Sequence, residues 1–423
     1  MNTLFIDITE LVGWGGKLTG VPRVMHELAI RFEKDDEYEV CFCSWDKERK
    51  VMRKINTVPE QFLYEDSKNK QKSRDDYVLN SIKKIIRSSR FLSLFTEVSI
   101  GSIRRLKRKL VLITTRVEEI NPIKGDLLFI LSEWHGNNPT FIEYLRRIKS
   151  SGVRLIHFSH DLLPIVAPQY TGHATGYFKN YARRIYPHCS LILVNSKHTK
   201  KDIENWLNKE KLKTPKIEVV RLGDDFKITK PHKPTNVEFL KTGLKGGDFL
   251  LCVGTIESRK NHMLLYYTYK LASHRGVNLP KLLLVGRKGW GSECFIDTIS
   301  NDPDVNNQII FMHDINDNVL SWLYDNCLFT IYPSFYEGWG LPIAESIAHD
   351  RTCLCSSTSS MPEVAGDLIT YFSPFSVDDC LSGIMTLLKF GNLAKAEKKL
   401  KDYKTTSWDE TYEQVKAIIK TSI

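Results

Sequence analysis

The sequence predicts an α/β fold with two domains, each built on a parallel β-sheet. Short apolar runs recur along the chain, helical patterns separate them, and the alternation stops and restarts once near the middle. Nearly continuous apolar runs are typical of strands covered on both faces, and strands that alternate with helices form parallel sheets. A length of 423 residues, with 42% hydrophobic and 26% charged residues, agrees with two or three globular domains.

Strand and helix patterns alternate through the N-terminal half. A strand is expected over 3–8, a glycine-rich loop over 13–23 and a helix over about 24–32, where apolar residues recur at helical spacing. Further strands are expected over 127–131, 153–158 and 191–194. The stretch from about 65 to 122 is polar, basic and partly helical, and we interpret it as an insertion.

The alternation breaks after about residue 221 and restarts at 249. The intervening prolines and glycines are typical of a linker between domains. A helix is expected over 263–273, and strands over 249–253, 281–285, 309–311, 328–332, 353–355 and 370–372. Ligands of parallel sheets bind beyond the carboxyl ends of the strands. We therefore expect the functional site in a cleft between two facing domains.

The charge of the chain favours an anionic partner, because the formal net charge is +10. The segment 83–109 carries nine of the cations and one acid, Glu97, with apolar residues interleaved. This composition is typical of a helix on an anionic membrane surface. A solvated helical insertion is nearly as well supported. Nucleic acid is a third interpretation, but no nucleic-acid-binding module accompanies the charge.

The cysteines and the N-terminus indicate a cytosolic protein. The nine cysteines are an odd number and include no Cys-x-x-Cys pair, so we expect buried free thiols and a reducing compartment. The N-terminal residues lack the pattern of a signal peptide. No run approaches the roughly 20 apolar residues that a membrane span requires.

The stretch 333–346 carries the most specific pattern. Glu337 and Glu345 flank a Gly338-x-Gly340 turn that leads through Pro342 into a helix. Glycines let the backbone approach an anion, and the N–H groups at a helix start can bind phosphate oxygens. The acids would repel the same anion and need hydroxyl partners instead. The pattern predicts a site for a nucleotide sugar, which has hydroxyls at both ends.

Two further loops follow strands of the second half. The first, 254–262, places Arg259 and Lys260 between a strand and a helix, where they could neutralise a diphosphate. A solvated basic turn is the alternative. The second, 285–291, has glycines and Trp290, which suit either the rim of a base-binding site or a loop packed by one tryptophan.

Other candidate residues carry weaker signals. His160 directly follows a strand, so it faces the presumed cleft, although a lone histidine is more often structural. The glycine-rich loop lacks the full Gly-x-Gly-x-x-Gly spacing, so no dinucleotide cofactor is indicated. The Asp-x-Asp pattern at 302–304 has a spacing that metal-dependent sugar transferases use, but Pro303 and the nearby asparagines favour a turn. No metal site is expected.

These residues resemble the retaining glycosyltransferases of the GT-B fold, family 4, most strongly from about 249 to 379. The spacing of Glu337 and Glu345 is similar to the paired-glutamate motif of that family, and 254–261 resembles its phosphate-binding loop. Two other segments, 285–290 and 359–367, are typical of its bacterial mannosyl- and rhamnosyltransferase-like members. The segments 19–23 and 160–164 match more loosely.

The resemblance implies a GT-B fold, in which two Rossmann-like domains with parallel sheets face each other across a cleft. It places an acceptor domain over 1–228, a nucleotide-sugar-binding domain over 229–402 and a C-terminal helical segment, 403–423, that crosses back onto the first domain. It implies retaining transfer of a hexose, with mannose or a 6-deoxyhexose such as rhamnose favoured. The acceptor would be a saccharide, expected to be lipid-linked, in bacterial surface polysaccharide (O-antigen or capsule) synthesis.

The resemblance also assigns roles. Arg259 and Lys260 would stabilise the departing nucleotide diphosphate, Glu337 would accept hydrogen bonds from donor-sugar hydroxyls, Glu345 would bind the ribose, and His160 would contact the donor sugar near its reacting carbon. The other expected substrate-binding residues are Gly16, Gly20, Arg23, Gly254, Arg287, Gly338, Trp339, Gly340 and Leu341. Retention is expected by front-face attack. Glu337 is the one nucleophile candidate in the motif for a double displacement, which we do not favour.

A second hypothesis is a non-catalytic protein that binds a nucleotide sugar or acts as a scaffold in a polysaccharide assembly. The intact acids and cations of the motifs argue against it. For the enzyme, no metal or other cofactor and no nucleic acid is expected. The expected location is the cytoplasm, with peripheral association at the cytoplasmic face of the inner membrane.

Overall fold

The computed structural model describes residues 2–14, 18–59, 117–132, 138–172, 174–225, 244–313 and 315–423. The chain divides into two compact units. Unit 1 comprises 1–128 and 138–153, and unit 2 comprises 129–137 and 154–423. Most of the expected insertion and all of the basic segment 83–109 lie outside the described residues, so those two predictions stay predictions, as do the domain boundaries.

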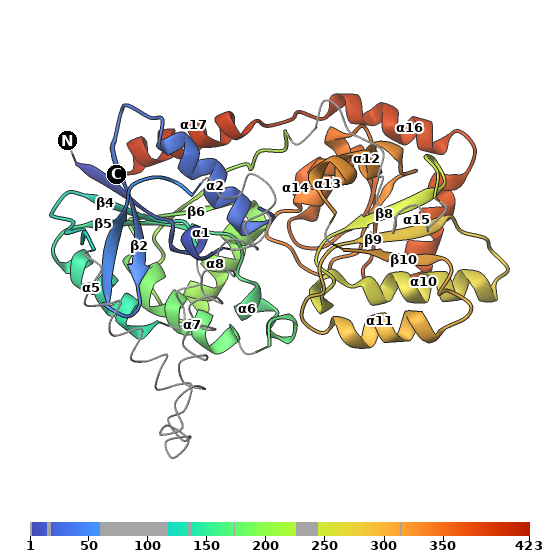
Figure 1. Ribbon diagram of the computed structural model, residues 1–423, viewed down its shortest axis with the longest axis horizontal. Coiled ribbons are helices and arrows are strands. Elements are labelled where there is room, and N and C mark those ends of the chain that lie inside the picture. Colours follow the sequence, from blue (N-terminus) through green and yellow to red (C-terminus); the bar gives the residue numbers. More distant parts are fainter. Residues whose placement is uncertain are drawn as a thin grey trace, which may run out of the picture. The chain divides into compact units, whose positions relative to one another are not determined.

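Unit 1 begins with a strand, two helices and a hairpin (Figure 1). Its elements are β1 (Thr3–Asp7), α1 (Thr9–Gly13), α2 (Val21–Phe32), β2 (Glu39–Asp46), β3 (Val51–Ile55), the start of β4 (Leu127–Ile130) and α5 (Pro139–Ser150). Strand β1 pairs with β2 in parallel, but β2 pairs with β3 antiparallel. The expected parallel sheet thus carries one antiparallel strand at its edge, because the connection at 47–50 is too short for a crossover.

Unit 2 continues with alternating strands and helices. These are β5 (Arg154–Ser159), α6 (Leu163–Val166), η3 (Pro168–Tyr170), α7 (Ala174–Ile185), η4 (Tyr186–His188), β6 (Leu191–Val194), α8 (Lys197–Lys209) and β7 (Lys216–Val219). Strands β5, β6 and β7 pair in parallel. The side chain of Ser196 caps α8 by accepting from the Thr199 N–H at 3.0 Å. Within the described residues, the first sheet has the order β3-β2-β1-β4-β5-β6-β7.

The second sheet begins after the break near the middle of the chain. Its strands are β8 (Phe249–Val253), β9 (Lys281–Val285), β10 (Ile309–Met312), β11 (Thr330–Tyr332), β12 (Cys353–Ser356) and β13 (Thr370–Phe372). They pair in parallel in the order β10-β9-β8-β11-β12-β13. The order reverses between β8 and β11, so the loops after these strands flank the position where doubly wound sheets bind ligands.

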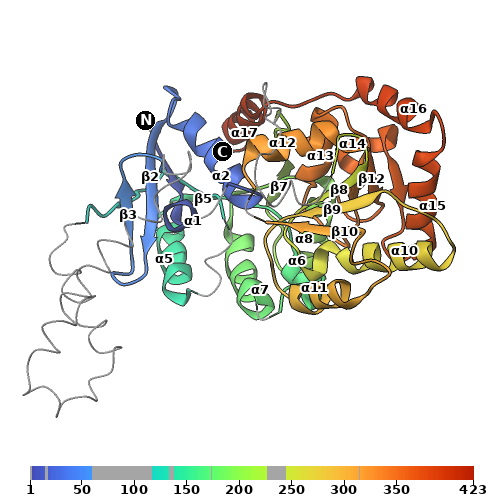
Figure 2. The ribbon, with the colours of Figure 1, turned by 45° about the vertical axis from the view of Figure 1, so that its right-hand side comes forward.

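Helices cover both faces of the second sheet. The helical elements that follow β8 along the chain are η5 (Ser258–Lys260), α10 (His262–His274), α11 (Ser292–Asn301), α12 (Asp317–Asn326), α13 (Leu341–Ala348), α14 (Met361–Ala365), η6 (Gly366–Leu368), α15 (Val377–Leu388), α16 (Asn392–Lys399), η7 (Leu400–Asp402) and α17 (Trp408–Ser422). Figure 1 and Figure 2 show α10 and α11 along one face, with α12 and α13 along the other.

The core of this sheet follows from the alternation of side chains along each strand. Leu250 and Cys252 pack with α10, α11 and α15, while Phe249 and Leu251 pack with α12. Successive residues of a strand point to opposite faces, so an unbroken apolar run fills two cores. This confirms the interpretation of the apolar runs as strands covered on both faces.

The final helix, α17, packs against the strands of the first sheet that belong to unit 2. It begins with a capping box of Ser407 and Glu410, and it contacts β6. Its C-terminal end is held by two hydrogen bonds, one from Lys216 Nζ to the Ser422 hydroxyl at 2.9 Å and one from Arg154 to the Ile423 carbonyl.

The cysteines are free thiols, as expected from the sequence. All nine cysteines lie in described residues and are free thiols; seven are buried, Cys41 is half-buried and Cys294 is exposed. Among the helices that the structure describes, none is both long enough and apolar enough to span a membrane.

Candidate functional site

The site is built where the second sheet reverses its strand order. The loop after β8 carries Arg259 and Lys260, and the loop after β11 carries Glu337. Because β8 and β11 are neighbours in the sheet, their C-terminal loops meet at one edge. A hydrogen bond from the Phe335 N–H to the Arg259 carbonyl at 3.0 Å joins the two loops.

Glu337 lies between the two cations. One carboxylate oxygen accepts from Arg259, and the other accepts from Lys260 Nζ at 2.7 Å and from the Tyr332 hydroxyl at 3.0 Å. The side chains of Arg259, Lys260 and Glu337 are 17%, 11% and 9% exposed. The structure therefore brings together three of the four predicted catalytic residues in a mostly buried, hydrogen-bonded cluster.

Arg259 is held from two sides. Glu257 accepts from its Nη2 at 2.7 Å and from its Nε at 3.1 Å, and the Tyr336 carbonyl accepts from Nη1 at 3.0 Å. A guanidinium has five N–H donors and an ammonium three. Lys260 Nζ also donates to the Tyr332 hydroxyl. With the described residues as partners, these contacts leave one N–H donor on Arg259 and one on Lys260 for a ligand.

The cluster fixes the charge of its members. Burial alone would raise the pKa of Glu337, but Arg259 and Lys260 outweigh burial and lower that pKa to about 2. Burial lowers the pKa of Lys260, and Glu337 opposes part of that change. Burial also acts to lower the pKa of Arg259, but Glu337 and Glu257 raise it above its ordinary value. At neutral pH, Glu337 is therefore a carboxylate that can only accept hydrogen bonds.

Asn261 fixes the shape of the basic loop. It takes a left-handed backbone conformation, with φ 56°, between η5 and α10. Asparagine tolerates this region better than most residues. Its side-chain amide donates to the carbonyls of Pro333 at 3.1 Å and Pro374 at 2.9 Å. Asn261 therefore ties the basic loop to the loops after β11 and β13, a role that the sequence did not reveal.

The turn of the motif is held by two serines. The Ser359 and Ser360 hydroxyls donate to the Glu337 carbonyl at 3.1 and 2.8 Å, and Ser360 also contacts the Trp339 carbonyl at 2.7 Å. The Glu337 N–H donates to Ser359 at 2.9 Å. The sequence marked these serines only as part of a family-like segment; their spacing gave no sign of this contact.

His160 lies against the motif. A Cβ atom at Gly338 would lie 2.0 Å from the His160 carbonyl oxygen, so only glycine fits there. The His160 Nε2 lies 2.8 Å from the Leu131 carbonyl. Since a carbonyl can only accept, Nε2 carries the proton, and Nδ1 of the neutral ring is an acceptor. Burial lowers the pKa of His160 to about 4, so the ring is neutral at pH 7.

Gly338→Ala is expected to lower the free energy of unfolding by about 1–3 kcal/mol, because its Cβ would overlap backbone of the His160 loop. Gly176→Ala is the matched control. Gly176 lies in helix α7 with no atom near its Cβ position, and alanine there should stabilise by about 0.5–1 kcal/mol. Denaturant unfolding measures both; equal stability of the two variants would contradict the close approach.

The remaining motif residues adopt helix-start geometry. Gly340 has φ 136° and precedes α13, which begins at Leu341. Pro342 is the second residue of that helix. Trp339 is buried, and the Arg221 guanidinium lies 5.8 Å from its ring. Glu345 lies in α13, where it accepts from the Tyr324 hydroxyl at 2.7 Å.

The two neighbouring loops pack closely. A Cβ at Gly286 would lie 1.9 Å from the Gly254 carbonyl, and the Gly254 Cβ position lies 3.6 Å from the Lys260 side chain. The Arg287 carbonyl accepts from the Ile256 N–H at 2.8 Å. Trp290 is 54% exposed, so its side chain is not the buried centre of a packed loop.

Three predicted binding residues lie in unit 1 or outside the described residues. Gly16 is outside the described residues. Gly20 has φ 57° and precedes α2, and Arg23 lies in the first turn of α2. Both belong to unit 1.

The Asp-x-Asp pattern is occupied by a lysine. Lys270 Nζ contacts Asp302 at 3.0 Å and Asp304 at 2.6 Å, and Asp302 also accepts from the Tyr266 hydroxyl at 2.8 Å. This agrees with the structural turn favoured by the sequence. Across the part of the chain that the structure describes, no three histidine, cysteine or acidic side chains gather as metal ligands.

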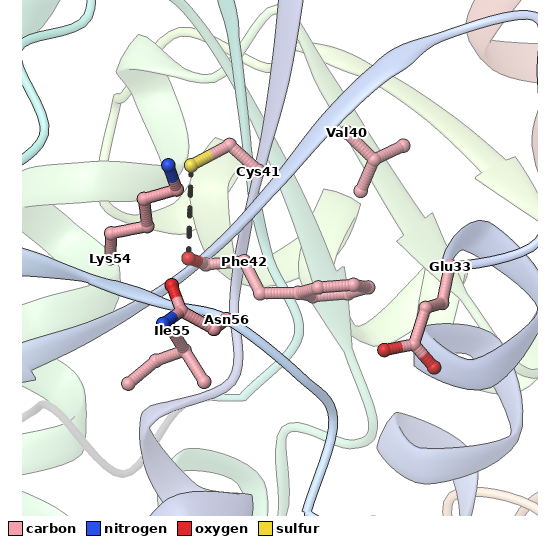
Figure 3. A pocket seen from close by; sticks show the side chains of 7 residues that line it. All are labelled: Glu33, Val40, Cys41, Phe42, Lys54, Ile55 and Asn56. Carbon is pink, nitrogen blue, oxygen red and sulfur yellow. Dashed lines mark hydrogen bonds between the residues drawn. The ribbon is translucent and has the colours of Figure 1, made fainter.

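Unit 1 contains a small pocket between the end of α2 and the β2–β3 hairpin (Figure 3). Its polar groups are engaged: Lys54 Nζ contacts Glu118 at 3.0 Å, and Glu33 accepts from the Val58 N–H at 3.2 Å. Burial raises the pKa of the Cys41 thiol, which makes it a weak nucleophile. None of the predicted site residues lines this pocket.

Stability is expected to fall as the pH drops below about 6.5. Burial lowers the pKa of His262 to about 3 and that of His160 to about 4. Below pH 6.5 these histidines bind protons in the unfolded chain but stay neutral in the folded protein. Each histidine therefore lowers the free energy of unfolding by up to about 1.4 kcal/mol per pH unit below 6.5. Because the folded protein lowers the pKa of Glu337, this carboxylate also reduces the free energy of unfolding as the pH falls below about 4.5.

Urea unfolding of His262→Asn between pH 4.5 and 7.5 tests this dependence. The variant should show a shallower decline of unfolding free energy with falling pH than the parent. His274→Asn, at the exposed end of α10, is the control and should keep the parent's slope. Identical slopes in all three proteins would contradict the prediction.

The part of the chain that contains the second sheet is similar to a known protein family. Residues 237–405 match the family model described as "Glycosyl transferases group 1". Over 254 residues, 58% of this chain, the sequence is 22% identical to the serotype-specific mannosyltransferase WbdA of Escherichia coli and covers 31% of that protein. Over 141 residues, 33% of this chain, it is 32% identical to the Escherichia coli O-antigen chain mannosyltransferase B and covers 37% of it.

The chain thus spans about a third of the length of these curated relatives. Among solved structures, Anabaena Alr3699/HepE in complex with UDP aligns with a TM-score of 0.61 at 14% identity, covering 100% of both chains. Sucrose-phosphate synthase from Thermosynechococcus elongatus aligns with a TM-score of 0.59 at 14% identity, over 100% of this chain and 99% of that chain. These likenesses confirm the predicted fold class, GT-B with two Rossmann-like parallel sheets.

Proposed function

We propose that this chain, whose residues 237–405 belong to the group 1 glycosyl transferases, is a retaining glycosyltransferase. It transfers a hexose from a nucleotide-diphosphate sugar to a saccharide acceptor. The observation that carries the proposal is the carboxylate of Glu337 held between Arg259 and Lys260, at the reversal of strand order in the second sheet. The sugar-transferase names of the relatives support the reaction class.

The cluster suits a donor with a charged and a hydroxylated end. Arg259 and Lys260 each keep one N–H donor, which two phosphate oxygens of a diphosphate can accept. The ionised Glu337 would repel phosphate and instead accept from sugar hydroxyls. Fixed charges of this kind stabilise a leaving group without reorganisation during the reaction.

The proposed reaction breaks the bond between the anomeric carbon and the phosphate oxygen. The acceptor hydroxyl oxygen forms the new bond on the same face, and its proton goes to the leaving phosphate oxygen, so the configuration is retained. Arg259 and Lys260 offset the charge that develops on the diphosphate. His160, next to Gly338, offers Nδ1 as an acceptor to a hydroxyl of the donor sugar.

For the transferred sugar we propose mannose, with a 6-deoxyhexose such as rhamnose as the second choice. The relatives named as mannosyltransferases, one of them an O-antigen chain enzyme, support this choice. A lipid-linked saccharide of surface polysaccharide synthesis is the proposed acceptor, which places the protein at the cytoplasmic face of the inner membrane.

We further propose that transfer requires no divalent metal. The positive charge beside Glu337 comes from Arg259 and Lys260, and the carboxylates of the Asp-x-Asp pattern are engaged by Lys270. Full activity after exhaustive chelation would support this, and restoration of lost activity by Mg²⁺ or Mn²⁺ would contradict it.

A panel of nucleotide sugars, including GDP-mannose, dTDP-rhamnose, UDP-glucose and UDP-N-acetylglucosamine, tests the donor class. A ligand that binds only the native state raises the midpoint of thermal unfolding, by an amount that grows with its concentration over Kd. At least one member should stabilise the protein and be converted to nucleoside diphosphate. Stabilisation without any turnover, with all acceptors tried, would favour the non-catalytic alternative.

A further inference from the structure

Three aromatic rings stand in a row beside the cation cluster. Tyr170 in η3 stacks on Phe335 with ring centroids 5.2 Å apart and planes 10° from parallel. Phe335 in turn contacts Phe375 with centroids 5.3 Å apart and planes 31° from parallel. We call Tyr170, Phe335 and Phe375 the aromatic row.

The row is built into the proposed transfer site. Phe335 lies two residues before Glu337, and its N–H donates to the Arg259 carbonyl at 3.0 Å. Asn261 holds the loops of Phe335 and Phe375 together through the Pro333 and Pro374 carbonyls. The positions of the rings and of the cations therefore depend on the same loop.

One end of the row is open. Phe375 is 75% exposed, although Phe335 and Tyr170 are half-buried. Polar residues stand in the neighbouring segment: the Thr358 hydroxyl donates to the Phe335 carbonyl at 2.8 Å, and the N–H of exposed Ser357 donates to the Phe372 carbonyl at 2.9 Å. Single exposed phenylalanines are common, but a stacked series with polar residues in the adjoining segment is a surface suited to a flat amphipathic ligand.

We infer that the aromatic row is a binding subsite for a pyranose ring of the acceptor saccharide, which stacks its C–H face on Phe375. A pyranose has an apolar face of C–H groups and an edge of hydroxyls. The C–H groups are weakly positive and match the negative face of an aromatic ring. The exposed Ser357, whose segment is tied by hydrogen bonds to the Phe335 and Phe372 carbonyls, supplies a hydroxyl for the polar edge.

The inference rests on the proposed function and names the second substrate. In the proposed function, the remaining N–H donors of Arg259 and Lys260 bind the diphosphate, and Glu337 and His160 bind hydroxyls of the donor sugar. Tyr170 follows His160 in the loop after β5, so the row connects that loop to the loops of the second sheet. This leaves the acceptor as the ring that the row would bind.

The test uses the full chain and measures saccharide and nucleotide binding separately. The saccharide probes are α-linked mannotriose and the methyl glycosides of mannose, rhamnose, glucose and N-acetylglucosamine; the nucleotide probes are UDP and GDP. Phe375→Ala is compared with the parent, with Phe375→Trp, and with Phe390→Ala. Phe390 is a fully exposed phenylalanine in the connection between α15 and α16, and it matches the loss of one exposed ring.

Phe375→Ala should raise the Kd of the bound saccharide about five- to tenfold, as expected for the loss of one stacked ring. It should leave the Kd of the nucleoside diphosphates and the midpoint of thermal unfolding unchanged. Phe375→Trp should restore saccharide binding, and Phe390→Ala should bind all probes like the parent.

Three results would overturn the inference: no probe saccharide binds the parent, Phe375→Ala binds saccharide as well as the parent, or Phe375→Ala weakens nucleotide binding equally. The last would assign the ring to the donor base. Failure of the proposed function would give a different result. The parent would then not convert any donor, although Phe375→Ala would still weaken saccharide binding and Phe375→Trp would still restore it.

Discussion

Glu337→Gln is expected to abolish sugar transfer, lowering turnover by about 100-fold or more, while the protein still binds nucleoside diphosphate. The substitution removes the negative charge that Arg259 and Lys260 share. The amide keeps one acceptor oxygen but cannot match the charge-assisted hydrogen bonds to the donor sugar. Affinity for UDP or GDP should stay the same or rise, because two cations lose their internal partner. Steady-state transfer rates and calorimetric titration of the nucleotide measure the two effects.

The same variant should be less stable. Removing one partner of a buried ion pair leaves an uncompensated charge and typically costs about 3–5 kcal/mol, and here two cations are affected. Transfer must therefore be measured well below the unfolding midpoint of the variant and divided by its folded fraction. Near-normal turnover per folded molecule would contradict the assignment of Glu337.

Lys260→Ala is expected to have the second-largest effect. It removes the point charge that we propose faces the leaving diphosphate, but it leaves Glu337 paired with Arg259. Transfer should fall about 100-fold or more. The Kd of nucleoside diphosphate should rise about ten- to a hundredfold, because a hydrogen bond to a charged group contributes about 1.5–3 kcal/mol.

Lys288→Ala is the matched control for this prediction. Lys288 is an exposed lysine in the loop after β9, the strand next to β8, and its removal changes the net charge equally. It should keep transfer and nucleotide affinity close to the parent's values. Equal losses in both variants would show that general positive charge, rather than the position of Lys260, determines binding.

The sequence anticipated most of the fold where apolar runs were unbroken. Buried parallel strands such as β8 and β9 were recognisable because both of their faces are covered. The two edge strands of the first sheet were not anticipated. The hairpin partner β3 and the edge strand β7, with the sequence Lys-Ile-Glu-Val, mix polar and apolar residues. Strands at a sheet edge expose one side, so their composition resembles that of a loop.

The candidate site was recognisable in part, for a similar reason. Arg259, Lys260 and Glu337 could be grouped because they follow strands of one parallel sheet, whose C-terminal loops share an edge. Tyr332, Asn261 and the two serines that hold the Glu337 turn were not recognised as site residues. Their contributions depend on side chains and carbonyls far apart in sequence. The contact of His160 with Gly338 likewise required the structure.

The aromatic row shows the limit of sequence patterns most clearly. Tyr170, Phe335 and Phe375 are separated by 165 and 40 positions, and none stands in a motif that specifies stacking. Only the pairing of β11, β12 and β13 and the hydrogen bonds of Asn261 bring two of the rings together.

The most direct test of sugar transfer at this site is donor turnover followed by phosphorus NMR, with the anomeric configuration of the product read by proton NMR. The parent, Glu337→Gln and Lys288→Ala are each incubated with the nucleotide sugar that stabilises the parent most, and with a saccharide acceptor. The parent and Lys288→Ala should release nucleoside diphosphate and form a glycoside with the anomeric configuration of the donor, while Glu337→Gln forms none. Inversion of configuration, or equal release by Glu337→Gln per folded molecule, would contradict the proposed retaining transfer at Glu337.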